Sequence, residues 1–393
     1  MGHHSRHAGA DTQRMRTIAL AVIVPTGLIT LLALIWLWPP PSNVADQSGR
    51  AAQHQGVVTG VTKQPCPETP AGQEPLPGGA TLDVNGCGTA QVKVSDGPDQ
   101  GLDVVVTLPN GPGAPTVEDG DEVILVLTEN PDGGQYDIVD HQRTKGLWLL
   151  GIAFTLAVVA FGRWRGFSAL IGLVATFALL LLFVVPAILA GESPLLVAIV
   201  GASAIMLTVL YLTHGLTFST SVAVLGTLAS LLLTGLLAAA SVAGMHLTGF
   251  ADESSTFLAT SHSVNLQGLL LAGIIIGSLG VLDDVTVTQA ATVTELARAN
   301  PEYGMRELYR AGTRVGRAHI ASVINTIILA YAGSSLPLLI LIAANNSSIG
   351  NVITTQVIAQ EIVRSVVATL GLIAAVPITT ALAAATARRT ITS

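Results

Sequence analysis

Stretches of about 20 apolar residues with almost no charged side chains recur along this 393-residue chain and limit what it can fold into. A helix needs roughly 20 such residues to cross the hydrocarbon core of a bilayer. Eight stretches qualify: Thr17–Trp38, Gly146–Gly162, Phe167–Ala190, Pro194–Leu212, Ser219–Ala240, Leu266–Leu282, Ile320–Ala343 and Ser365–Thr386. Only 11% of the residues are charged, against about 25% in soluble domains. We therefore expect an α-helical polytopic membrane protein with about eight transmembrane helices.

The distribution of Lys and Arg predicts the orientation of these spans. With the N-terminus inside, twelve of the 18 lie in inner segments, five lie in outer segments, and Arg364 falls in or beside the last span. Short cytoplasmic loops carry such an excess. We expect a protein of the cytoplasmic membrane with both termini in the cytoplasm. Its parts would be tails at 1–16 and 387–393, a signal-anchor helix at 17–38, an outer domain at 39–145, and a seven-helix core at 146–386 with a basic cytoplasmic loop at about 294–318.

The outer domain reads as a series of short strands separated by Pro, Gly and Asp clusters. The expected strands are Gln55–Val61, Ala90–Val94, Leu102–Leu108, Glu122–Thr128 and Tyr136–Val139. Five strands in about ninety residues predict a small extracytoplasmic β-barrel or sandwich, similar to an oligonucleotide/oligosaccharide-binding barrel. Its 15 acidic and 5 basic residues form either a solvated surface or an acidic antechamber that concentrates cations.

Both cysteines of the chain, Cys66 and Cys87, lie in this outer domain. Because the domain is expected on the oxidising side of the membrane, we predict a disulfide between them. Two unpaired thiols are the alternative. No metal site is expected, since no His flanks either cysteine.

The sixth span carries the most informative polar residues, the adjacent acids Asp283 and Asp284. At about 100° per residue, Gly273, Gly277, Gly280 and Asp284 fall on one face of a helix. Glycines at this spacing let another helix approach closely. The pattern therefore predicts that Asp284 ends a packed seam and faces protein, with Asp283 about 100° away.

The depth of the pair decides its meaning. If the span ends at Leu282, both acids lie at the inner surface and are interfacial or capping residues. If the helix continues to about Val293, Asp284 lies roughly 13 Å inside the membrane. An ionisable residue there is a functional candidate, because it can bind and release a proton or a small cation.

Other polar residues could assist the pair. Asn325, in the seventh span, lies near the depth of Asp284. It either neighbours Asp284 or makes a hydrogen bond between two helices. Gln289 follows the two acids on their own helix. At the start of the last span, Gln360, Glu361 and Arg364 form either an ion pair that fixes helix position or the outer end of a polar path.

The segment Leu271–Pro301, LAGIIIGSLGVLDDVTVTQAATVTELARANP, resembles the signature stretch of the YibE/F-like membrane protein family. The resemblance implies a multi-pass membrane protein for which transport is the presumed activity. GSLGVLDDVTVTQ, followed by a basic helix and by residues 316–326, is also similar to the fourth and fifth spans of resistance-nodulation-division exporters. That similarity implies a proton-carrying role for Asp283 and Asp284.

These features predict a proton- or cation-coupled secondary transporter or export component. Asp284 is the expected carrier, Asp283 tunes it, and Asn325 is a hydrogen-bonding neighbour. The alternative is a non-transporting scaffold or signalling protein whose outer domain binds a partner. We expect no enzyme activity, because the chain lacks HExxH and GxSxG motifs. No cofactor, metal or nucleic acid is expected; the partners are the lipid bilayer, a proton or monovalent cation, and a protein at the outer domain.

Overall fold

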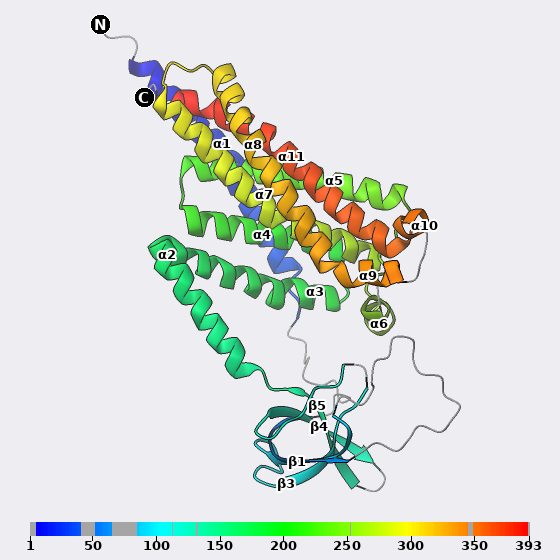
Figure 1. Cartoon of the computed structure of the whole chain (residues 1–393). Helices are drawn as coiled ribbons and strands as arrows, with labels where there is room; N and C mark the ends of the chain where they lie inside the picture. Colours follow the sequence, from blue (N-terminus) through cyan, green and yellow to red (C-terminus); the bar gives the residue numbers. More distant parts are fainter. Residues whose placement is uncertain are drawn as a thin grey trace. The chain divides into compact units, whose positions relative to one another are not determined.

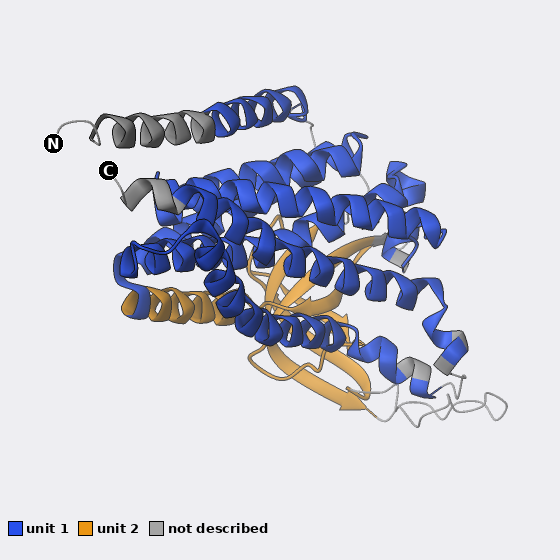
Figure 2. Ribbon diagram, turned by 90° about the horizontal axis from the view of Figure 1, so that it is seen from above, with its two compact units in different colours: residues 1–41, 161–393 blue, residues 42–160 orange. Residues whose placement is uncertain are grey.

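The chain is described by a computed structural model covering residues 5–40, 52–64, 85–111, 113–130, 133–251, 253–344 and 349–391. It divides into two compact units, one made of residues 1–41 and 161–393 and the other of residues 42–160. Figure 2 colours these units separately.

Helices make up most of the described chain, as the long apolar stretches predict. They are α1 (Ser5–Trp36), α2 (Thr144–Leu179), α3 (Val185–Leu189), α4 (Pro194–His214), α5 (Phe218–Gly244), α6 (Glu253–His262), α7 (Leu266–Ala299), α8 (Met305–Ser334), α9 (Leu336–Ala344), α10 (Ile349–Ile353) and α11 (Gln356–Ile391), with a π-helical segment at Leu180–Val184. Among the described residues, six helical segments are long and apolar enough to cross a membrane.

The longest of these segments, Thr144–Leu189, has 46 residues and combines α2, the π-helical segment and α3. Arg163 interrupts α2 with φ 51° and ψ −129°, a backbone conformation outside the helical region. The π-helical turn comes just before Pro186, which has no N–H to donate to the preceding turn. Two apolar stretches therefore meet at Arg163.

Helices α5, α7 and α11 form the centre of the helical unit, with α4 and α8 packed against them (Figure 1). Their apolar core includes Met206, Val224, Leu279, Leu282 and Leu372. Helix α1 begins and α11 ends at the same end of this bundle (Figure 1).

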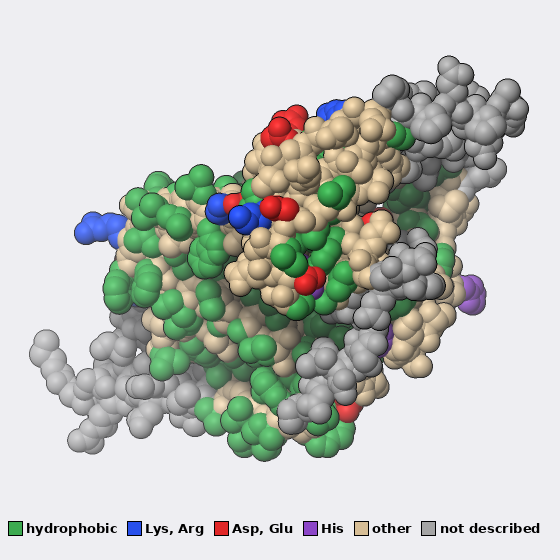
Figure 3. Space-filling view, turned by 90° about the horizontal axis from the view of Figure 1, so that it is seen from below, with side chains coloured by type: hydrophobic (Ala, Val, Ile, Leu, Met, Phe, Trp, Pro, Cys, Tyr) green, Lys and Arg blue, Asp and Glu red, His purple; other side chains and the backbone are tan. Residues whose placement is uncertain are grey.

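The outside of the helices is strongly apolar. The side chains of Phe161 and Trp164 are 96% and 81% exposed, and many Leu, Ile and Val residues of the other helices are also exposed. Figure 3 shows hydrophobic side chains spread over the visible helical surface. A soluble monomer rarely exposes so large an apolar area. This surface is suited to contact with lipid.

The segment expected as a basic loop is largely helical. Helix α7 continues to Ala299, and α8 begins at Met305, so only five residues connect them. Leu308, Gly312, Gly316 and Ile320 give α8 a buried face at helical spacing. The cytoplasmic location of this segment stays a prediction. Its arginines occupy the exposed side: Arg306, Arg310, Arg314 and Arg317.

The second unit contains a five-stranded antiparallel sheet at the positions expected from the sequence. The strands are β1 (Gln53–Gln64), β2 (Cys87–Val94), β3 (Asp103–Thr107), β4 (Glu122–Asn130) and β5 (Gly133–His141), in the order β3-β2-β1-β4-β5. Strand β1 pairs with β4 through Gln53–Val57 and with β2 through Gly56–Gln64, with a register shift between Val58 and Gly60. Alternating side chains from the five strands build one apolar core.

Candidate functional site

Asp283 lies in the middle of α7, with 17 residues before it and 16 after it in a helix of 34. Its side chain is half-buried, and its Oδ1 is inaccessible to solvent and has no hydrogen-bond partner among the described residues. At about 1.5 Å per residue, Asp283 is roughly 25 Å from either end of the helix. A buried carboxylate oxygen without a partner is costly, so Asp283 is a candidate functional residue.

One hydroxyl group lies beside this carboxylate, and a second is hydrogen-bonded to the first. The Thr227 side chain of α5 lies beside it. Thr227 Oγ1 is 2.6 Å from Thr286 Oγ1 of α7, and both residues are fully buried. Thr286 also donates to the Asp283 backbone carbonyl at 3.2 Å. The carboxylate and two hydroxyl groups thus come from α5 and α7.

More buried hydroxyls continue along α5. Ser230 and Thr234 are fully buried and donate to the carbonyls of Gly226 and Ser230 at 2.8 Å each. On α11, Thr379 is also fully buried and lies against Gly226; its Oγ1 has no hydrogen-bond partner in the described parts of the chain. We call these residues the hydroxyl seam: Thr227, Ser230, Thr234, Asp283, Thr286 and Thr379.

Asp284, the next residue of α7, differs from Asp283 because its side chain is exposed in the single chain. The expectation that Asp284 faces protein is therefore wrong, whereas the expected roles of the two aspartates stay predictions. The 100° between neighbouring residues is as expected. However, the face of α7 that turns toward α5 is the one that carries Leu282, Thr286 and Asp283.

The three glycines expected to pack, Gly273, Gly277 and Gly280, lie on the exposed face of α7 with Asp284. A Cβ at Gly273 or Gly280 would meet no atom within 4 Å, and one at Gly277 would meet only the Tyr331 hydroxyl, at 3.5 Å. They do not form the helix-packing seam expected from their spacing, because the side of α7 that carries Ile275, Leu279 and Leu282 packs into the bundle.

Gln289 is buried, but it joins helices rather than the carboxylate pair. Its Nε2 donates to the Gly312 carbonyl of α8 at 2.9 Å and to Thr380 Oγ1 of α11 at 2.7 Å. A Cβ at Gly316 would lie 2.7 Å from Gln289 Oε1. Glycines 312 and 316 therefore make room for this amide.

The other predicted polar residues lie elsewhere. Asn325 is exposed on α8 and makes no hydrogen bond with either aspartate in the described part of the chain. Gln360 is buried and donates to the Phe250 carbonyl at 2.9 Å. Glu361 and Arg364 form an ion pair at 3.2 Å near the start of α11. The Gln360 bond joins α11 to the segment before α6, whereas the Glu361–Arg364 pair lies within α11 itself.

In the β-unit, Cys87 begins β2 and is disulfide-bonded. Cys66, the expected partner, lies outside the described residues, so the pairing stays a prediction. The same unit holds a buried tyrosine: Tyr136 donates its hydroxyl to Asp99 at 2.7 Å. This hydrogen bond and burial raise the Tyr136 pKa to about 12.

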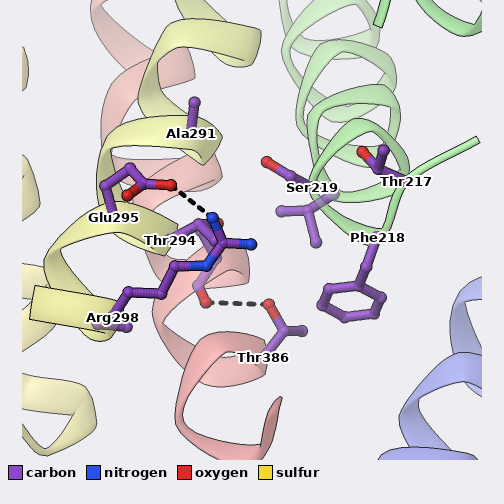
Figure 4. Close-up of a pocket in the computed structure, with 11 residues that line it drawn as sticks. Thr217, Phe218, Ser219, Ala291, Thr294, Glu295, Arg298 and Thr386 are labelled. Carbon is purple, nitrogen blue, oxygen red and sulfur yellow. Dashed lines mark hydrogen bonds and ion pairs between the residues drawn. The ribbon is translucent and has the colours of Figure 1, made fainter. Parts of the chain in front are cut away.

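A cavity of about 580 Å³ opens between α5, α7 and α11, at the end of the bundle where α5 begins. Figure 4 shows Glu295 and Arg298 of α7 facing Ser219 and Phe218 of α5, with Thr386 of α11 below them. The deepest lining residues, Val222, Ala297 and Ala383, are almost fully buried and belong to one apolar cluster. Gly226 and Thr379 lie one helical turn beyond Val222 and Ala383, so this layer separates the cavity from the hydroxyl seam.

Sequence reasoning missed the hydroxyl seam and its close contacts. A Cβ at Gly226 would overlap Thr379 Oγ1, and one at Gly371 would overlap Thr234 Oγ1. A signal was present, since Thr227, Ser230 and Thr234 follow one another at helical spacing on α5.

Long apolar helices with an exposed apolar surface and a polar interior define a helical membrane protein. Residues 150–389 match the YibE/F-like protein family, and the chain belongs to that family. The match covers the helices from α2 onward and leaves the β-unit outside. No curated protein and no solved structure matches the chain.

Proposed function

We propose that this protein is a multi-pass transporter of the cytoplasmic membrane that couples substrate movement to a proton or another small cation. Asp283 is the residue that binds this ion. The observation that carries the proposal is the inaccessible, unpartnered Oδ1 of Asp283 halfway along a long apolar helix. Acidic side chains are expensive in such positions and mark ion pathways.

Eight spans are obtained when one of the six long helical segments is counted as two spans and the apolar part of α1 is added. Thr144–Leu189 is about 69 Å long at ~1.5 Å per residue, more than twice the ~30 Å hydrocarbon core. The non-helical backbone at Arg163 divides it into two spans. The apolar part of α1, Ala21–Trp36, supplies another. An even number of spans agrees with the start of α1 and the end of α11 lying at one end of the bundle (Figure 1).

The excess of Lys and Arg in the segments predicted as inner supports cytoplasmic termini. In this orientation the cavity opens to the cytoplasm and the β-unit lies outside. The strand order, with β3 and β5 in contact at the two edges, supports a five-stranded oligonucleotide/oligosaccharide-binding type of barrel. Such a domain would bind a partner protein on the outer side.

The mechanism follows from the arrangement of these groups. A proton or cation held by Asp283 neutralises the buried carboxylate, and the oxygens of Thr227 and Thr286 can share a cation with it. The apolar layer formed by Val222, Ala297 and Ala383 closes the cytoplasmic route. Transport requires these residues to separate so that the ion can leave to the cytoplasm.

The adjacent aspartates offer a matched test, since Asp283→Asn and Asp284→Asn remove the same charge one residue apart. An apolar carbodiimide reacts with protonated carboxyl groups inside membranes. We expect it to label Asp283 in the reconstituted protein, with labelling that falls as pH or the concentration of a monovalent cation rises. Asp284→Asn should keep this labelling and Asp283→Asn should lose it. Labelling confined to Asp284, or insensitive to both pH and cations, would refute the assignment.

The scaffold alternative makes a different prediction. A chain ending at residue 145 keeps the first span and the β-unit but has no hydroxyl seam. If this chain restored normal growth to a deletion strain, the transporter proposal would fail. We expect restoration only from the full chain, and loss of it with Asp283→Asn while the variant still inserts into the membrane.

A further inference from the structure

We propose that the cavity between α5, α7 and α11 binds a small zwitterion, a molecule with a carboxylate, an ammonium group and a compact apolar body. An α-amino acid with an aliphatic side chain has this chemistry. The proposal names a substrate class for the transporter and rests on the proposed function only for the claim that the bound molecule is moved.

A charge pair at the cavity mouth supplies the two opposite partners that a zwitterion needs. Arg298 Nη1 donates to Glu295 Oε1 at 2.6 Å, and the two side chains are 66% and 68% exposed. An exposed pair of this kind is weak and can open to admit a ligand. Guanidinium has five N–H donors and a carboxylate has two oxygens, so each group retains bonding capacity while paired.

The orientation of this pair is suited to a ligand inside the cavity. Figure 4 shows the guanidinium of Arg298 extending from α7 toward α5, with Glu295 beside it on the preceding turn. A ligand carboxylate can accept from Arg298 while an ammonium group donates to Glu295. Charge-assisted hydrogen bonds of this type are stronger than neutral ones.

Hydroxyl groups add donors and acceptors on the facing walls. Ser219 of α5 is half-buried, lines the cavity, and its hydroxyl has no hydrogen bond to other described residues. It can donate to a ligand carboxylate. Thr294 of α7 donates its hydrogen to the Ala290 carbonyl at 2.8 Å, so its oxygen is left to accept from an ammonium group.

The remaining wall selects for a compact apolar body. It is lined by Phe218, Val222, Ala291, Ala297 and Ala383. A volume of about 580 Å³ is within the range of small-molecule sites, which combine apolar walls with a few polar groups. A highly hydrated sugar or an inorganic ion would leave this wall unused.

The test uses three probes that share one aliphatic body: L-valine, N-acetyl-L-valine without the ammonium group, and isobutylamine without the carboxylate. Binding to the full-length protein in detergent is measured by isothermal titration calorimetry. Because each missing charged contact is worth about tenfold or more in affinity, we expect L-valine to bind at least about tenfold more tightly than either truncated probe.

Variants assign the two ends of the ligand. Arg298→Gln should weaken the binding of L-valine by at least about tenfold and leave the affinity for isobutylamine unchanged. Glu295→Gln should likewise weaken the binding of L-valine and leave the affinity for N-acetyl-L-valine unchanged. Both positions are exposed, so the fold should persist. Arg310→Gln, on the exposed face of α8, is the matched control and should not change binding. Equal binding of L-valine and a truncated probe, or no binding of any probe, would overturn the proposal.

Asp283→Asn and the labelling of Asp283 distinguish failure of the zwitterion site from failure of the transporter proposal. Asp283→Asn should still bind L-valine, because Asp283 lies beyond the apolar layer. If no probe binds while the labelling of Asp283 still depends on pH, the zwitterion site is wrong and the ion site stands. If L-valine binds as expected but Asp283 is never labelled, the cavity is a ligand site and the transporter proposal fails.

Discussion

Replacing Gly371 with alanine tests the contact between α5 and α11 that holds the hydroxyl seam together. The new Cβ would overlap Thr234 Oγ1 and lie 3.1 Å from Thr234 Cβ, against about 3.4–4 Å in ordinary contacts. Thr234 Oγ1 is held by its hydrogen bond to the Ser230 carbonyl, 2.8 Å away. The overlap must therefore push the helices apart, at a cost of about 1–3 kcal/mol.

Gly273→Ala is the matched control for this change. It also lies inside a long helix, but its Cβ would meet nothing within 4 Å. Both substitutions gain the same ~1 kcal/mol of helix propensity, so the difference between them isolates the packing cost. We expect Gly371→Ala to be about 1–3 kcal/mol less stable than Gly273→Ala. Unfolding of the purified protein in mixed micelles, followed by circular dichroism, measures both.

A double substitution identifies the clashing atom. Thr234→Ala removes the overlapping Oγ1 and leaves only the 3.1 Å contact to Cβ, which is about 0.3 Å short of an ordinary one. Gly371→Ala combined with Thr234→Ala should therefore recover most of the lost stability. If Gly371→Ala proves no less stable than Gly273→Ala, the inference that α5 and α11 approach closely at Gly371 is refuted. The hydroxyl seam between these helices would then be refuted as well.

Two further substitutions test other parts of the molecule. Gln289→Leu removes the two hydrogen bonds that Gln289 Nε2 donates to the Gly312 carbonyl and to Thr380 Oγ1, and should destabilise the bundle by about 1–3 kcal/mol in the same unfolding assay. An unchanged stability would contradict the role of Gln289 in joining α8 to α11. Because the pKa of Tyr136 is raised from 10.0 to about 12, its hydrogen bond to Asp99 contributes stability that is complete below pH 10 and is lost as pH rises toward 12. Tyr136→Phe should therefore lower stability at neutral pH and remove the alkaline loss between pH 10 and 12; an identical alkaline profile for both proteins would contradict this linkage.

The secondary structure was largely predictable because each element depends on local pattern. Helix α4 begins at Pro194, as expected, since proline fits the first helical turn. In the strand at Glu122–Asn130, Val123 and Leu125 are buried while Ile124 and Val126 are partly exposed, as expected from a period of two. The sequence left open whether the helix ends near Leu282 or continues to about Val293. The buried residues Gln289, Val293 and Ala297 continue its inner face, and α7 ends at Ala299.

The candidate site was predictable only to the level of a segment. Sequence spacing correctly placed Asp283 and Asp284 on different faces of one helix. It did not decide which face turns inward, because glycine spacing permits close packing without requiring it. The side that carries Ile275, Leu279 and Leu282 has more apolar surface to bury against α4, α5 and α11, and this orientation brings Asp283 to Thr227.

By itself, the sequence determined that this chain forms long apolar helices and a small antiparallel sheet. Helices follow from apolar length, since a backbone in lipid must satisfy its own hydrogen bonds, and strands follow from alternation. Only the tertiary structure decided which aspartate is buried, which glycines approach a neighbour, and where a cavity forms. These features depend on the rotation of each helix against several others at once, and no periodicity within a single helix records that rotation.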